Sequence, residues 1–187
     1  DKDAALILDD VRCAFRFTLG STWETLGVLP DLCAMSKSVA NGYALAVVTG
    51  NDRFREGASQ IYTTGSFWFA STSFAASLAT IAAIQEEDSI AAIKTAGDAL
   101  RKGLAELAES HGFSLRQTGP SQMPLVLFED DDMWEKNNFF VSEAAQRGVY
   151  LHPWHNMFVS AAHSEADIAE ALQRTDGAFE AVKKHFG

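Results

Sequence analysis

Two polar residues, Asp9 and Lys37, end short apolar segments of the chain, and their types suggest a cofactor site. Burial among apolar groups lowers the pKa of a lysine and makes its amine a nucleophile suited to Schiff-base chemistry. Ligands of parallel α/β sheets bind at the carboxyl ends of the strands, so we expect both side chains at one sheet edge. This pair fits pyridoxal 5'-phosphate (PLP), whose aldehyde the lysine would hold and whose ring nitrogen the carboxylate would keep protonated.

Each residue also has a simpler interpretation. Lys37 could be a strand-end lysine whose ammonium group extends to the surface. The Asp9–Asp10 pair could be an acidic strand end that begins a turn. The cofactor hypothesis therefore depends on the two residues occurring together.

The elements needed to position this pair are predicted by apolar patterning. Three short strands are expected at about 5–9, 31–35 and 44–49, and their continuous apolar character is typical of a sheet covered on both faces. A short helix is expected over 51–59. The Ser/Thr/Gly and aromatic loop 62–74 then leads into a helix of small residues.

The rest of the chain has a different pattern. Apolar residues spaced by three and four predict a helix from Ser89 to His111. Ser164 and Asp167 form a capping box for a last helix. Two strands, at 113–119 and 123–129, an amphipathic helix within 130–148 that has an acidic start and ends at Gly148, and two further strands, at 149–154 and 157–163, are expected between them. The sequence thus predicts an α/β part and a smaller α+β lobe, with a break near residues 85–90.

Composition excludes some classes of function. With 25 acidic and 15 basic residues the net charge is −10, which argues against nucleic acid as the main partner. We find no uncharged apolar run of membrane-spanning length and no signal peptide. Cys13 and Cys33 are expected to be buried free thiols in a reducing compartment, the cytoplasm. Because an apolar strand pattern begins almost at the first residue, we expect the chain to be part of a larger fold.

Residues 6–50 resemble the cofactor segment of class III PLP-dependent aminotransferases, especially the glutamate-1-semialdehyde aminomutase branch. The resemblance extends to the C-terminal segment 148–172 and corresponds to the second half of the family's usual length. The motifs that carry it are Asp9-Asp10-Val11, Ala14-Phe15-Arg16, Pro30-Asp31-Leu32, Ser36-Lys37 and Asn41-Gly42.

The resemblance implies a fold and an activity. The fold is that of a type I PLP-dependent transferase, with part of the large domain in residues 1–86 and the small domain in 87–187. The activity is transfer of an amino group between an amine or amino acid and a keto acid or aldehyde. Its aminomutase branch implies an alternative, movement of the amino group within one molecule.

The resemblance also implies roles for individual residues. Lys37 would be the Schiff-base lysine and proton shuttle, Asp9 the partner of the pyridinium nitrogen, and Val11 a contact on one ring face. Gly65 and Ser66 would reach the cofactor phosphate of a neighbouring subunit, which implies a homodimer; read locally, Ser66 is an ordinary loop or N-cap serine.

Substrate contacts are less defined. Bulky side chains at Trp68 and Phe69 suggest an aromatic-lined substrate pocket, and Arg12 or Arg16 could pair with a substrate carboxylate or form a structural salt bridge.

Two hypotheses of other classes compete with the enzyme. His152, His155 and His163 are close in sequence and could hold zinc, although Pro153 interrupts helical placement and no fourth ligand is evident. The chain could also be a folded, non-catalytic remnant that dimerises. Cofactor absorbance, bound zinc, or neither would distinguish the three.

Overall fold

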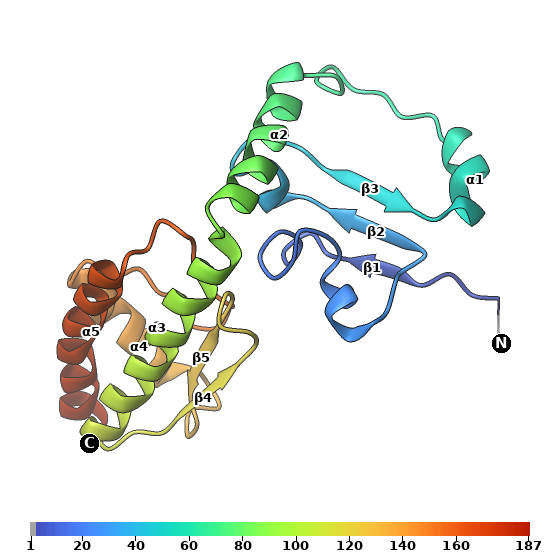
Figure 1. Cartoon of the computed structure of the whole chain (residues 1–187). Coiled ribbons are helices and arrows are strands. Elements are labelled where there is room, and N and C mark those ends of the chain that lie inside the picture. Colours follow the sequence, from blue (N-terminus) through green and yellow to red (C-terminus); the bar gives the residue numbers. More distant parts are fainter. Residues whose placement is uncertain (1–2) are drawn as a thin grey trace. The chain divides into compact units, whose positions relative to one another are not determined.

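The computed structural model describes residues 3–187, which form two compact units that divide between Ile90 and Ala91. In the first unit, β1 (Ile7–Asp9), β2 (Leu32–Met35) and β3 (Val47–Gly50) form one sheet in that order (Figure 1). Strands β1 and β2 are parallel, whereas β3 runs antiparallel to β2. The prediction that these three segments share a sheet is confirmed.

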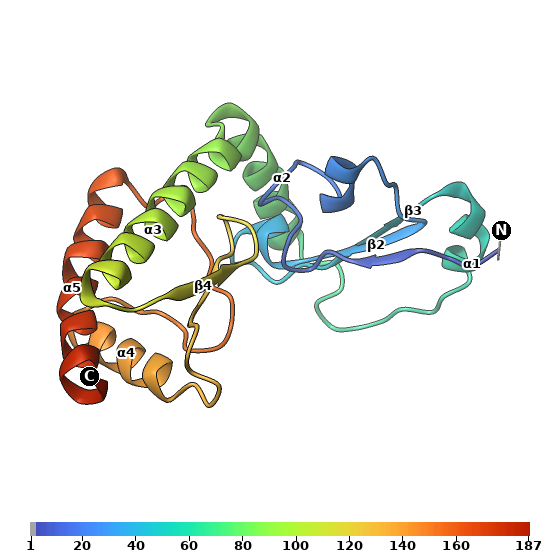
Figure 2. The same cartoon turned by 90° about the horizontal axis from the view of Figure 1, so that it is seen from below.

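One face of this sheet is packed. Leu8, Cys33 and Met35 are buried against Ala14 and Phe15 of the connection from β1 to β2. In Figure 2 this connection, which contains the 3-10 helix η1 (Thr22–Leu26), lies on one side of the strands. Helix α2 (Ser71–Glu86) adds partly buried isoleucines to the same cluster, Ile81 and Ile84.

The opposite face of the sheet is open within the described residues. Ile7 and Val48 are 64% and 71% exposed. Residues of β2, of β3 and of the short helices η3 (Asp52–Phe54) and α1 (Arg55–Ser59) line a shallow hollow on this face. The expectation of a sheet covered on both faces is therefore wrong for the described residues, in which only η3 and α1 lie against part of this second face.

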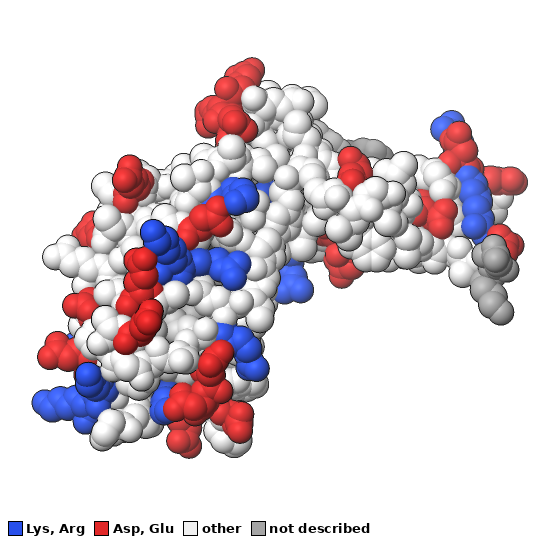
Figure 3. All heavy atoms as spheres, turned by 60° about the horizontal axis from the view of Figure 1, so that its bottom comes forward, with Lys and Arg blue, Asp and Glu red and all other residues white. Residues whose placement is uncertain are grey.

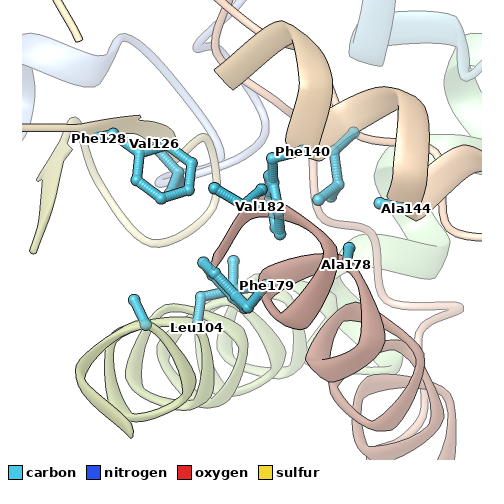
Figure 4. Close-up of a cluster of buried hydrophobic side chains, with 10 residues drawn as sticks. Leu104, Val126, Phe128, Phe140, Ala144, Ala178, Phe179 and Val182 are labelled. Carbon is cyan, nitrogen blue, oxygen red and sulfur yellow. The ribbon is translucent and has the colours of Figure 1, made fainter. Parts of the chain in front are cut away.

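The second unit has a closed core. Helix α3 (Ser89–His111) begins before the division and continues into this unit, where β4 (Leu115–Thr118) and β5 (Leu125–Phe128) form an antiparallel pair. Helices α4 (Glu135–Gln146) and α5 (Glu165–Phe186) complete the unit. Figure 4 shows the buried cluster, which includes Leu104, Val126, Phe128, Phe140, Ala144, Ala178, Phe179 and Val182.

The helix boundaries of the second unit follow local signals. The Ser164 hydroxyl accepts the Asp167 N–H at 3.2 Å, and the Asp167 carboxylate accepts the Ser164 N–H at 2.8 Å, so the predicted capping box is present.

Charged side chains one turn apart pair along the helices, as in Lys94–Asp98 and Arg147–Glu143. On the face drawn in Figure 3, basic side chains accordingly lie among acidic ones.

Two predicted strands, 149–154 and 157–163, are absent from the described structure. The N–H groups of Met157 and Val159 do reach the carbonyls of Pro124 and Gln122, at 2.8 and 3.0 Å. Pro124 has no N–H to return, so no reciprocal ladder forms there. In the segment 149–154, the Trp154 N–H donates to the His152 ring, and so does the N–H of the next residue, His155, instead of pairing with another strand.

Candidate active site

Asp9 and its neighbour Asp10 have different environments. Asp9 ends β1 on the open face, where it is exposed and its Oδ1 accepts the Val11 N–H at 3.2 Å. Asp10 is only 1% exposed, and its carboxylate accepts the N–H and hydroxyl of Thr22 at 2.7 and 2.5 Å. Asp9 is thus available to a ligand, whereas Asp10 anchors the connection from β1 to β2.

Lys37 begins the 3-10 helix η2 (Lys37–Ala40), which is separated from the end of β2 by Ser36 alone. Its backbone is left-handed, with φ of 50°, a conformation uncommon for residues other than glycine and often found at functional sites. The side chain is exposed and makes no hydrogen bond or ion pair with the part of the chain that the structure describes. The expected burial of Lys37 is therefore wrong here, since it lies beyond the packed face of the sheet.

Sheet topology places these two residues at one edge. Because β1 and β2 are parallel, both strands end at the same side of the sheet, with Asp9 opposite Ala34 and Lys37 just beyond Met35. A carboxylate and a free amine at the carboxyl ends of adjacent parallel strands occupy the usual position of ligand sites in such sheets.

Ser36 was not singled out as a site residue, yet it shapes the Lys37 loop. Its hydroxyl donates to the Leu45 carbonyl at 2.7 Å and so joins the two ends of the loop between β2 and β3. Helix η2 also packs against α2. The sequence signals for Ser36 were its position next to the lysine and its place in the Ser36-Lys37 motif.

Arg16 and the two cysteines of the first unit are packed against their own chain. The Arg16 Nε donates to the Arg12 carbonyl at 3.0 Å, and burial lowers the pKa of Arg16. Both cysteines are free thiols, as expected, and burial raises the pKa of each; Cys13 is half-buried rather than fully buried. Neither thiol is thereby favoured as a nucleophile.

Gly65 and Ser66 lie in the exposed loop before α2. The Gly65 carbonyl accepts the Trp68 N–H at 3.1 Å, which makes a local turn. Within residues 3–187, no hydrogen bond links this loop to Asp9 or Lys37. The chain therefore does not by itself bring these two residues to the Asp9–Lys37 edge.

The three histidines proposed as an alternative metal site bind backbone groups instead. His152 Nδ1 accepts two N–H groups, His155 Nδ1 contacts the Asn156 carbonyl at 2.7 Å, and His163 Nδ1 accepts the Ser160 N–H. In residues 3–187, no group of three or more His, Cys, Asp or Glu side chains is arranged to hold a metal ion. These ring nitrogens bind nearby backbone groups and so fix the conformation of the loops that carry them.

In the described part of the chain, no helix is both long enough and apolar enough to cross a bilayer.

Comparison with known proteins gives a consistent family. The family model described as "Aminotransferase class-III" matches residues 1–178. The aminopentol aminotransferase of Sphingopyxis macrogoltabida is 42% identical over 183 residues, which are 98% of this chain and 43% of that protein. The glutamate-1-semialdehyde 2,1-aminomutase of Methanosarcina acetivorans is 29% identical, over 92% of this chain and 44% of that protein.

A solved structure resembles the chain closely. The PLP internal aldimine form of the FumI protein from Sphingopyxis sp. MTA144 has a TM-score of 0.96 and 42% identity over 98% of this chain and 44% of its own. The expected type I PLP-dependent transferase fold, present in part, is confirmed. The chain spans less than half the length of the relatives it matches.

Proposed function

This chain belongs to the class III aminotransferase family, and we propose that it is the lysine-bearing part of a PLP-dependent transaminase. The reaction would move an amino group between an amine or amino acid and a keto acid or aldehyde. The observation that carries the proposal is the placement of Asp9 and Lys37 at the ends of adjacent parallel strands.

The residues at this edge fit PLP chemically. The exposed Lys37 amine would attach the cofactor's aldehyde and move the substrate proton, because it has no competing partner among the described residues. The Asp9 carboxylate would hold a proton on the ring nitrogen, and Val11 would contact the ring. Bound PLP supplies an electron sink for the carbanion formed when the substrate loses its proton.

We favour transamination over an aminomutase reaction. The relative at 42% identity is named an aminotransferase, whereas the aminomutase is 29% identical. The first relative's name also favours an amine as the amino donor. The alternative to an enzyme is a folded remnant without catalytic activity. Covalent trapping of PLP at Lys37, described below, distinguishes the two.

We further propose that the enzyme works as a homodimer in the cytoplasm. Phe67 and Phe69, exposed at 87% and 82%, follow Gly65 and Ser66, which would serve the neighbouring subunit's cofactor phosphate. Such apolar surface favours a protein partner. In this proposal residues 1–86 belong to the large domain and 87–187 are the small domain, and the free thiols support a reducing compartment.

The test is covalent trapping at Lys37. Borohydride reduction of the purified protein with PLP should add the cofactor's mass to the peptide that contains Lys37. Lys37→Ala should abolish the adduct and lower transamination at least about a thousandfold, because the group that binds the aldehyde and moves the proton is lost. Lys94→Ala, which removes a lysine of the second unit paired with Asp98, is the control and should keep both properties. An unchanged adduct in Lys37→Ala would refute the assignment.

A further inference from the structure

The loop that carries Lys37 has an unusual backbone. Lys37, Asn41 and Gly42 all have positive φ, at 50°, 43° and 103°. Glycine adopts such values freely and asparagine tolerates them, whereas in a lysine they bring Cβ too close to the following carbonyl oxygen. A strained residue of this kind keeps its conformation only where the surrounding contacts hold it. The contacts around Lys37 therefore decide where its amine lies.

Ser36 closes this loop at its base. The last pair of the β2–β3 ladder is Met35 with Val47, and one residue farther the Ser36 hydroxyl donates to the Leu45 carbonyl at 2.7 Å. This bond continues the link between the two strands beyond their last paired residues. Because the Leu45 side chain packs against the buried cluster of the first unit, the hydroxyl is bonded to a fixed point.

The other side of the loop is held by packing. Val39 and Ala40, in η2, are 4% and 0% exposed and belong to the same buried cluster, and η2 contacts α2. Lys37 lies between this packed helix and the Ser36 bond, and its side chain makes no hydrogen bond or ion pair within residues 3–187. The direction in which the amine extends is therefore set by the backbone on each side of it.

We propose that Ser36 is a positioning residue, whose hydroxyl bond holds Lys37 in the left-handed conformation that presents its amine to the cofactor aldehyde. This inference rests on the proposed function, in which Lys37 binds PLP. In the bonding step the Lys37 ammonium first loses a proton to solvent. The Nζ lone pair then forms a bond with the aldehyde carbon, and the aldehyde oxygen leaves as water with the two remaining amine hydrogens. Ser36 acts only on where Nζ lies.

The hydroxyl, and not the strand conformation, is what distinguishes serine here. Ser36 has φ of −159° and ψ of −153°, an extended backbone that alanine and threonine also adopt. Alanine keeps the strand but loses the donor, so Lys37 can relax towards right-handed backbone, which redirects its side chain. Threonine keeps a hydroxyl on Cβ and should restore the bond. The loss of one such bond should lower the population of the strained conformer about fivefold.

The test separates bond formation from cofactor binding. The purified protein is mixed with saturating PLP and reduced with borohydride at successive times, so that the adduct at Lys37 reports bond formation. Pyridoxine 5'-phosphate, which has an alcohol in place of the aldehyde, reports binding alone. Ser36→Ala should slow formation of the adduct about fivefold and leave the Kd for pyridoxine 5'-phosphate within about twofold of the unaltered protein. Damage to the whole site would change both.

Two further variants serve as controls. Ser36→Thr should return the rate of adduct formation to that of the unaltered protein. Ser59→Ala removes a hydroxyl that also donates to a backbone carbonyl, that of Glu56, at 2.7 Å in the same unit. It should leave the rate and the Kd unchanged.

Hydrogen–deuterium exchange of the cofactor-free protein measures the loop itself. The N–H groups of Val39 and Asn41 donate to the carbonyls of Ser36 and Ser38, at 3.2 and 3.3 Å. Both amides should exchange faster in Ser36→Ala than in the unaltered protein, in Ser36→Thr or in Ser59→Ala, because the loop has lost the bond at its base.

Several outcomes would overturn the inference. These are an unchanged rate of adduct formation in Ser36→Ala, an equal loss of pyridoxine 5'-phosphate binding, or no recovery of the rate in Ser36→Thr. Absence of any PLP adduct at Lys37 in the unaltered protein would instead refute the proposed function. The positioning of Lys37 by Ser36 would then be supported by faster exchange in Ser36→Ala and overturned by unchanged exchange.

Discussion

The two units differ in how completely their apolar residues are covered. In the second unit Leu104, Phe179 and Val182 are fully buried within a core built from three helices and a strand pair. In the first unit Ile7, Val48 and several aromatic side chains are exposed. The Asp9–Lys37 edge belongs to the first, open unit. The first unit, which carries the proposed cofactor residues, therefore leaves one whole face of its sheet uncovered within the described residues, and such a surface is suited to binding further polypeptide.

The largest expected effect separates the closed core from the open surface. Phe179→Ala should lower the free energy of unfolding by about 3–5 kcal/mol, because it leaves a cavity among Phe128, Phe140 and Leu104. This loss should be the same at all protein concentrations. Denaturant unfolding followed by circular dichroism measures it.

Phe69→Ala is the matched change on the open unit. In dilute, dissociated protein it should alter the free energy of unfolding by less than about 0.5 kcal/mol, because the side chain is 82% exposed. In the proposed dimer it should instead shift association, visible by light scattering. A cost equal to that of Phe179→Ala in dissociated protein would contradict the comparison between the units.

A smaller effect on stability distinguishes the buried carboxylate of Asp10 from the exposed carboxylate of Asp9 on the open face of the sheet. Thr22→Val should destabilise by about 1–3 kcal/mol, because it removes the hydroxyl donor of the buried Asp10 carboxylate. Asp9→Asn, on the open face, should leave stability nearly unchanged but weaken PLP binding, because the ring nitrogen loses its charged partner. Thermal unfolding and cofactor titration measure the two properties. Equal stability losses in both variants would show that the faces do not differ as described.

The sequence predicted those features whose signals are local. The helix Ser89–His111 and the Ser164–Asp167 capping box depend on residues one or two turns apart, and both are present. The shared edge of Asp9 and Lys37 followed from two apolar segments and the geometry of parallel strands.

Features that depend on distant packing were missed. The exposure of Lys37 depends on which polypeptide covers the open face, and apolar patterning alone cannot reveal that. The strands expected at 149–154 and 157–163 failed because Pro124 cannot return a hydrogen bond and because His152 satisfies nearby N–H groups. The bond between Asp10 and Thr22 likewise joins residues that only the turn after β1 brings together.

The smallest expected effect concerns helix ends. Helix α5 begins with the reciprocal bonds of Ser164 and Asp167, whereas α2 begins at Ser71, and its N-cap residue Ala70 offers no side-chain cap. Ser164→Ala should therefore lower the free energy of unfolding by about 1 kcal/mol at pH 7. Ser142→Ala, at an exposed position inside α4, is the control and should have almost no effect.

The pH dependence of this loss identifies the bond responsible. Hydrogen bonds from the Ser164 hydroxyl and backbone N–H hold the pKa of Asp167 below its ordinary value. Because that carboxyl has a lower pKa in the folded than in the unfolded chain, the folded state binds fewer protons. Its stabilisation is complete above the unfolded pKa of about 3.9 and is lost as pH falls through the lowered folded value. The difference between Ser164→Ala and the unaltered protein should accordingly be constant from about pH 7 to 5 and shrink below about pH 4. A difference that stays constant down to pH 2.5, in urea unfolding at each pH, would mean that Ser164 acts through the bond that its hydroxyl accepts from the Asp167 N–H and not through the Asp167 carboxylate.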